Sequence, residues 1–233
     1  MPEIAVPETL VGGPAAPSAE SGAPSTEPGA PTAEARAECS VSLWWIPVGH
    51  EFPLMATLAK GWERLRALKA GRSPRELLHV ALEVQLDSST KFVIELVPAG
   101  FGPARTSTGV VGNGPILSRA LGWMRMFQYE IRRWKNGVVE AKDKSTRPPS
   151  TYVITRDQAL QIIDGASRAP RHPWGQDVLG NGDMWNSNSL VSFVLVSAGM
   201  DPAAIEPPAS ADWPGWDTGV ALARTNATLT LVA

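Results

Sequence analysis

NSNSLVSFVLVSAG, residues 186–199, joins four polar residues to a run that is apolar at nearly every position. A helix that is apolar around its whole axis has to be buried on all sides, so we predict a buried helix over 189–198. Gly199 suits its C-terminal cap, and Asn and Ser are preferred residues at an N-terminal cap. The rest of the fold must therefore pack around this segment.

Two segments upstream of this helix alternate between apolar and polar residues, which is typical of strands buried on one face. The apolar face carries Val80, Leu82, Val84 and Leu86 over 79–86, and Phe92, Ile94 and Leu96 over 91–97. The turn at 87–90 joins the two strands into a hairpin. Matching the apolar faces requires an odd number of loop residues, and that register places His79, Glu83 and Glu95 on one face.

The rest of the chain gives further strand and helix signals. They are strands over 41–47, 127–134 and 152–154, a helix over 54–70, a tight turn at 135–137 into 138–139, and a proline-rich loop carrying Trp213 and Trp216. Thr155 and Gln158 form a capping box at the start of another helix, which we expect to end near Gly165. Hairpins followed by helices predict an α+β fold, with an antiparallel sheet packed against the buried helix.

Composition divides the chain into two parts. Of residues 1–37, 23 are Pro, Gly, Ala or Ser, and none is aromatic. Such a segment cannot bury enough apolar area to offset the entropy lost on ordering. We therefore expect a disordered tail over 1–38 and a single soluble α+β domain over 39–233.

Charge, cysteine content and hydropathy restrict the classes of function. The net charge of −2 gives no electrostatic case for nucleic acid or an anionic membrane as the main partner. Cys39 is the only cysteine, which excludes an internal disulfide and a cysteine-based metal centre, and we expect no metal and no cofactor. We expect no secretory signal, because Met1-Pro2-Glu3-Ile4 lacks the basic start and apolar stretch of one, and the longest apolar run, 190–200, is about half a membrane span. We expect a cytoplasmic protein without a transmembrane segment, with signal-less export as the alternative.

Ser187 lies where the buried helix is predicted to begin, a position that favours nucleophilic chemistry. Unpaired backbone N–H groups and the positive end of the helix dipole stabilise negative charge there. A nucleophilic serine needs a base, and the chain has only three imidazoles, His50, His79 and His172. His79 is the best candidate because it begins a strand on the polar face, with Glu83 and Glu95 as the candidate orienting carboxylates.

Each of these residues also has a structural interpretation. In that interpretation the Asn-Ser run only caps the helix, and His79 is a half-exposed strand residue without a task. His172 lies in a turn and is a candidate to line a pocket, and His50 is a loop residue only.

Two further segments invite a binding interpretation. The glycine-rich stretch 109–115 lacks the Lys-Ser/Thr ending of a phosphate-binding loop, so we interpret it as a flexible turn. Residues 119–147 hold eight Lys or Arg against three Asp or Glu, interleaved with aromatic residues. A solvated hairpin face is the more common reason for such a pattern, so nucleic acid is not the expected partner.

Residues 184–193, MWNSNSLVSF, resemble the Asn-Cys/Ser-Asn-Ser/Thr-Phe-Val signature of permuted papain-like proteins, which include the lecithin–retinol acyltransferase type and several uncharacterised bacterial families. The likeness spans 75–220. It implies a strand histidine that precedes a nucleophile at the start of a buried helix, and His79 and Ser187 match those two positions. Well-understood members have cysteine where this chain has Ser187. The residue therefore marks either a serine variant or a domain that has lost activity.

The expected function is that of a hydrolase or acyltransferase acting on an amide or ester bond. Ser187 attacks the carbonyl, His79 is the base, Glu95 is the third catalytic residue, and backbone N–H groups near Asn188 and Ser189 bind the oxyanion. The expected substrate-binding residues are Asn186, Asn188, Ser189, Trp174, Trp185, Trp213 and Trp216. The alternative is a catalytically inactive papain-like binding module with a Trp-lined cleft.

Overall fold

The computed structural model describes residues 38–48, 53–99, 109–145, 147–209 and 211–232, apart from the side chains of 53–55, 58 and 229–232. The predicted tail lies outside these ranges up to residue 37, and so does His50. Within them the chain forms an α+β fold with a seven-stranded sheet and four α-helices. This confirms the predicted fold class.

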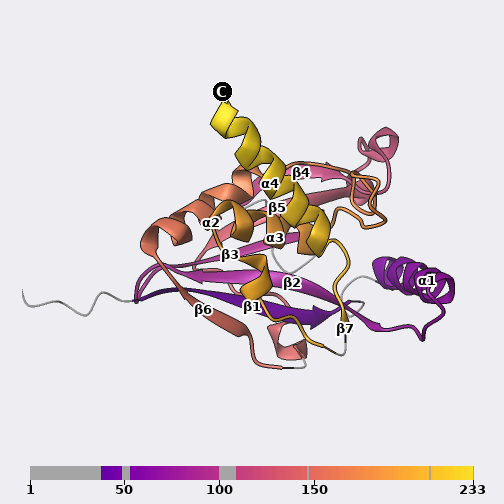
Figure 1. The fold of residues 1–233 in the computed structure, drawn as a ribbon, viewed down its shortest axis with the longest axis horizontal. Coiled ribbons are helices and arrows are strands. Elements are labelled where there is room, and N and C mark those ends of the chain that lie inside the picture. Colours follow the sequence, from indigo (N-terminus) through magenta and orange to yellow (C-terminus); the bar gives the residue numbers. More distant parts are fainter. Residues whose placement is uncertain (1–37, 49–52, 100–108, 146, 210, 233) are drawn as a thin grey trace, which may run out of the picture. The chain divides into compact units, whose positions relative to one another are not determined.

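Six strands form the sheet in the order β4-β5-β3-β2-β1-β6, and all neighbours in this order are antiparallel (Figure 1). The strands are β1 (Cys39–Pro47), β2 (Glu76–Gln85), β3 (Lys91–Pro98), β4 (Val110–Pro115), β5 (Gln128–Lys135) and β6 (Ser150–Ile154). The short β7 (Ala211–Asp212) pairs in parallel with the start of β2. All five predicted strands are present, with shifted ends.

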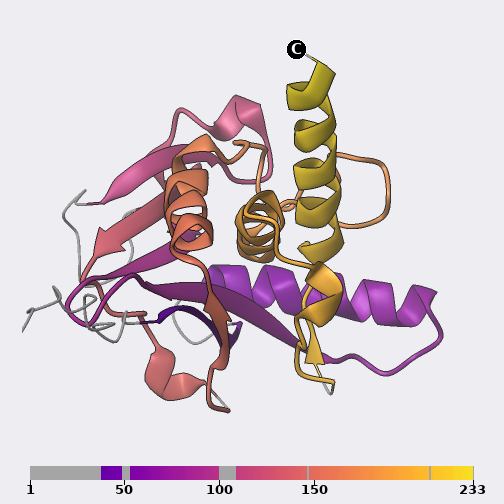
Figure 2. The same cartoon turned by 60° about the vertical axis from the view of Figure 1, so that its left-hand side comes forward.

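The helices are α1 (Pro53–Lys69), α2 (Arg156–Arg168), α3 (Ser187–Ser197) and α4 (Trp216–Val232). α2 and α3 pack on the sheet, α4 packs against α3, and α1 contacts β2 (Figure 2). Thr155 and Gln158 form the predicted capping box of α2. Asn186 caps α3, and Gly199 follows its end with φ +77.

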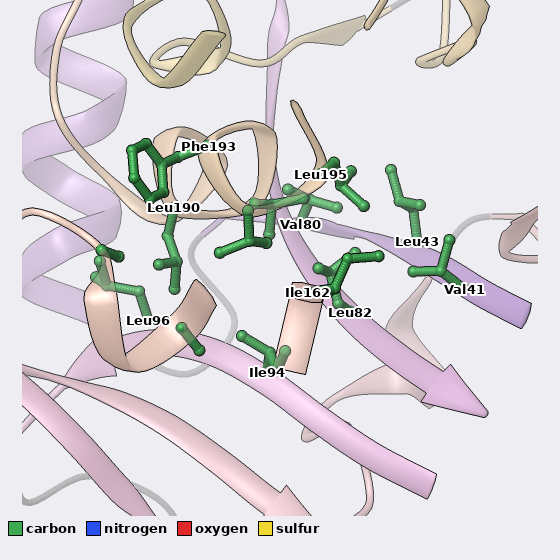
Figure 3. Close-up of a cluster of buried hydrophobic side chains, with 14 of the residues drawn as sticks. Val41, Leu43, Val80, Leu82, Ile94, Leu96, Ile162, Leu190, Phe193 and Leu195 are labelled. Atoms are coloured by element: carbon green, nitrogen blue, oxygen red, sulfur yellow. The ribbon is translucent and has the colours of Figure 1, made fainter. Parts of the chain in front are cut away.

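α3 is buried as predicted, and it forms the centre of the hydrophobic core. Side chains of β1, β2 and β3 point toward it, together with one side chain of α2 (Figure 3). The labelled residues of this cluster are Val41, Leu43, Val80, Leu82, Ile94, Leu96, Ile162, Leu190, Phe193 and Leu195. Full burial of each such side chain contributes roughly 1.5–3 kcal/mol. Packing of this core therefore fixes the position of α3 on the sheet.

The loop of the β2–β3 hairpin has an odd number of residues, as predicted. Gln85 pairs with Lys91, so the loop contains the five residues 86–90, an odd number. Leu82 and Ile94 consequently face α3 together, whereas His79 and Glu95 lie on the other face of the hairpin.

The prediction of a flexible turn over 109–115 is wrong, because residues 110–115 form the edge strand β4. The glycines permit close packing there: a Cβ atom on Gly114 would overlap the ring of Tyr129 on β5. Glycine in this strand thus reflects the approach of a neighbouring ring, a use that glycine has within sheets.

The chain turns at Asn136, and residues 138–139 after it form no strand. Two further predictions need correction. α2 continues through Gly165, which faces Val194 of α3, and ends at Arg168. Trp216, predicted in a loop, is the first residue of α4.

Candidate active site

The N-terminal end of α3 meets the sheet where β2 and β3 separate. The two strands pair between Leu82 and Gln85, and beyond this point β3 continues along β5. The side chain of Asn188 binds the edge of β2 there: its Oδ1 accepts from Val80 N–H at 2.9 Å and its Nδ2 donates to the Leu78 carbonyl at 2.9 Å. One buried amide thus satisfies two backbone groups of the strand and positions the start of α3.

This attachment brings Ser187 to His79. The Ser187 Oγ lies 2.7 Å from Nδ1 of His79, within hydrogen-bonding distance. Ser187 is 4% exposed, and His79 is half-buried. The structure therefore places together the two groups that the sequence singled out as nucleophile and base. When Nδ1 accepts the hydrogen bond from the Ser187 hydroxyl, the single proton of the neutral ring is on Nε2.

The cap of α3 occupies most of the backbone donors at this helix end. The Asn186 Oδ1 accepts from Asn188 N–H at 2.8 Å and from Ser189 N–H at 3.2 Å, and Ser189 Oγ accepts from Asn186 N–H at 3.0 Å. The Asn188 and Ser189 N–H groups, near which the oxyanion site is expected, are therefore both bound within the cap. Ser187 N–H donates to no group in the described ranges. It is the remaining backbone donor of this turn.

Asn186, Asn188 and Ser189 serve the architecture of the site. Asn186 Nδ2 donates to the Pro214 carbonyl at 2.7 Å, and Asn188 Nδ2 donates to the same oxygen at 2.9 Å. Ser189 is fully buried and donates to the Met184 carbonyl at 2.9 Å. All three side chains are engaged within the protein, which explains their types without a ligand.

Burial lowers the pKa of His79 from 6.5 to about 4, because the charged ring would lose its hydration among the surrounding atoms. The imidazole is consequently neutral at pH 7. A neutral imidazole beside a hydroxyl can accept its proton, as a general base requires.

This shift predicts a pH dependence of stability that is independent of any enzymatic activity. The unfolded chain takes up the histidine proton first as the pH falls, so the contribution is complete above about pH 6.5 and disappears toward about pH 4. We expect His79 to reduce the free energy of unfolding by roughly 2.5 kcal/mol between pH 7.5 and 4.5.

Urea unfolding of the wild type and of His79→Gln at both pH values measures this contribution. The wild type should lose more stability than the variant by that amount, because the other titrating groups are common to both proteins. Equal losses in the two proteins would contradict the lowered pKa.

The candidate carboxylates do not orient the imidazole in this structure. Glu95 is 2% exposed and shares the face of His79, but no hydrogen bond joins the two side chains in the described part of the chain. Glu83 forms an ion pair with Lys91 at 2.8 Å. His79 thus has Ser187 as its hydrogen-bond partner among the described residues.

A cavity of about 340 Å³ lies in front of the Ser187–His79 pair. Its volume is at the lower end of the range typical of small-molecule sites. Its walls are mostly apolar, with Glu95 and Glu140 among the few charged residues. α1 contributes Ala59 and Trp62 to the wall.

Only one of the four predicted tryptophans lines this cavity. Trp174 does so, whereas Trp185 is fully buried and donates from Nε1 to the Tyr129 hydroxyl at 3.3 Å. Trp213 and Trp216 pack against Trp45, with ring centroids 6.4 and 6.1 Å away. Trp185 and Trp216 are therefore part of the hydrophobic core, and Trp213 is partly buried against it.

Trp62 was not predicted to line a cavity. It lies within the helix predicted over 54–70, and helical spacing alone does not separate a cavity wall from a core contact. The structure holds α1 in place through Arg66, whose Nη1 lies 2.7 Å from the Asp212 carboxylate.

His172 is not among the described residues that line the cavity. His172 packs edge-on against Trp185 at 5.6 Å, and burial together with the charge of Arg119 lowers its pKa. The described residues contain no group of three His, Cys, Asp or Glu side chains arranged to hold a metal ion. None of the helices in these ranges combines the length and the apolar content needed to cross a membrane.

Comparisons of the chain with protein-family models, with curated proteins and with solved structures found no match.

Proposed function

We propose that the domain is a hydrolase or acyltransferase that acts on an amide or ester bond through Ser187 and His79. The observation that carries the proposal is the 2.7 Å separation of Ser187 Oγ and His79 Nδ1 beside a mostly apolar cavity. The lowered pKa of His79 supports it, because a base must be unprotonated before it accepts a proton.

The reaction begins when Ser187 Oγ bonds to the carbonyl carbon and its proton passes to His79 Nδ1. The electron pair of the carbonyl moves onto oxygen, and Ser187 N–H is the proposed donor to that oxyanion. When the intermediate collapses, the bond to the amine or alcohol breaks, and His79 returns the proton to this leaving group. Water or an acceptor hydroxyl then releases the acyl group from Ser187 by the same steps.

We further propose a permuted papain-like arrangement for the fold. Its support is the chain order, because the imidazole comes from the strand β2 and the hydroxyl follows from the first residue of the buried helix α3. Serine at this position requires a closely held base, since its hydroxyl is a weak nucleophile at neutral pH.

A catalytically inactive binding module is the second candidate. Two observations favour it: the Asn188 and Ser189 N–H groups are bound by Asn186, and His79 has no orienting carboxylate bonded to it in the described ranges. In this case the cavity binds a mostly apolar ligand and catalyses no reaction.

A fluorophosphonate probe tests the proposal. We expect the wild type to be labelled and the adduct to map to Ser187, since the probe reacts with activated serine hydroxyls. Ser187→Ala should abolish labelling, and His79→Ala should slow it by at least about 100-fold because the base is lost.

Ser167→Ala is the matched control, because Ser167 is an exposed serine on α2. It should be labelled at the wild-type rate. A folded wild-type protein that gains no adduct at Ser187, or one whose labelling is unchanged in His79→Ala, would overturn the hydrolase proposal and leave the binding module.

A further inference from the structure

Three large apolar side chains are exposed within the connection between β4 and β5. Trp123 is 79% exposed, Met126 is 63% exposed and Leu117 is 51% exposed. They lie within segment 116–128, which extends past the paired ends of the two strands and includes η1 (Arg119–Leu121) and η2 (Arg125–Phe127) (Figure 1). Three large exposed apolar side chains within one short segment are typical of a contact surface.

Segment 116–128 holds its backbone in place through its own hydrogen bonds. Gly122 N–H donates to the Arg119 carbonyl, Met124 N–H to the Leu121 carbonyl, and Phe127 N–H to the Met124 carbonyl. Gln128 Nε2 donates to the Gly122 carbonyl at 2.6 Å. These internal bonds reduce the cost of moving the segment into a less polar medium, where unpaired backbone groups are expensive.

The charge around these side chains is positive, although the whole chain is nearly neutral. Arg119 and Arg125 are exposed, and residues 99–129 contain no Asp or Glu. The nearest acidic contact is Glu130, 3.7 Å from Arg125, whose side chain remains 64% exposed. Segment 116–128 therefore combines an aromatic ring, two flexible apolar chains and two exposed cationic groups.

We propose that segment 116–128 docks on an anionic lipid bilayer, with Trp123 and Met126 among the acyl chains and Arg119 and Arg125 on the headgroups. Tryptophan prefers the interface of a bilayer, and arginine binds anionic headgroups. A nucleic acid would contact the two arginines and the Trp123 ring. Binding to it would not explain why Leu117 and Met126 are exposed. The proposal does not depend on the chemistry of Ser187.

Docking in this way would place the cavity at the membrane surface. Leu117 is both exposed and part of the cavity wall that also contains Ser187. A ligand leaving the bilayer would therefore reach the cavity beside the docked segment.

Flotation of the full-length chain with vesicles tests the proposal, using phosphatidylcholine alone and phosphatidylcholine mixed with phosphatidylglycerol. We expect binding to the mixed vesicles only. Trp123→Ser with Met126→Ser should weaken it at least about tenfold, through the lost apolar burial. Arg119→Gln with Arg125→Gln should weaken it roughly 30-fold, through the lost attraction to the headgroups.

Two controls complete the experiment. Val153→Ser replaces a side chain that is 70% exposed on β6, the opposite edge strand of the sheet, and should bind like the wild type. Ser187→Ala should also bind like the wild type, so this result is separate from the outcome of probe labelling. Urea unfolding verifies that each variant is folded.

Three results would overturn the proposal. The first is that a folded wild type binds neither vesicle, and the second is that the Trp123 and Met126 variant binds as well as the wild type. The third is binding to a polynucleotide or heparin without binding to the mixed vesicles, which would assign the segment to a nucleic acid.

Discussion

Replacing Gly219 by alanine is expected to lower the free energy of unfolding by about 3 kcal/mol or more, although alanine is the better helix former. Gly219 lies on α4, which packs against α3. A Cβ atom there would overlap the backbone carbonyl of Ser189 and the hydroxyl of Ser192. The carbonyl belongs to the buried helix and cannot move aside, so the two helices would have to separate.

Gly61→Ala provides the matched control. Gly61 lies in α1, is exposed, and has no atom within 4 Å of the position where a Cβ would stand. This substitution should raise stability by up to about 1 kcal/mol through helix propensity. Urea unfolding of both variants gives the comparison, and a gain in stability for Gly219→Ala would show that α3 and α4 are not in close contact.

The same helix α4 shows why part of the fold escaped prediction. The sequence signals its neighbour α3 locally, through the polar cap and the apolar run that follows. The start of α4 is instead capped from a distance: Asp183 accepts from Gly215 N–H at 2.6 Å and from Thr218 N–H at 3.3 Å. With prolines just before it and its capping carboxylate more than thirty residues upstream, nothing local distinguishes this helix from a loop.

The candidate site was predictable to the extent that it rests on local structure. Helix burial and strand alternation pointed to Ser187 and His79, and the two lie within hydrogen-bonding distance. The capping of α3, which binds the Asn188 and Ser189 N–H groups, could also be predicted. Ser189 stands three residues after Asn186, as Gln158 stands three residues after Thr155 in the capping box of α2. The cavity walls could not be predicted, because periodicity identifies apolar faces but not the gaps between them.

The attachment of α3 to β2 leads to the last prediction, that Asn188→Leu lowers the free energy of unfolding by about 4 kcal/mol. Leucine has a similar size but cannot bond to Val80 N–H or to the Leu78 and Pro214 carbonyls. Val80 N–H and the Leu78 carbonyl are then left without this partner, whereas the Pro214 carbonyl still accepts from Asn186 Nδ2. Each unsatisfied buried group costs roughly 1–3 kcal/mol, so the loss of two gives the large effect.

Asn113→Leu is the control for this change, because Asn113 is exposed on β4 and its replacement should alter stability by less than about 0.5 kcal/mol. Urea unfolding measures both variants. Below the unfolding transition, Asn188→Leu should also slow labelling of Ser187, because the amide that holds α3 at β2 also holds the hydroxyl at the imidazole. If Asn188→Leu is as stable and as reactive as the wild type, apolar packing alone positions α3, and the amide has no part in forming the site.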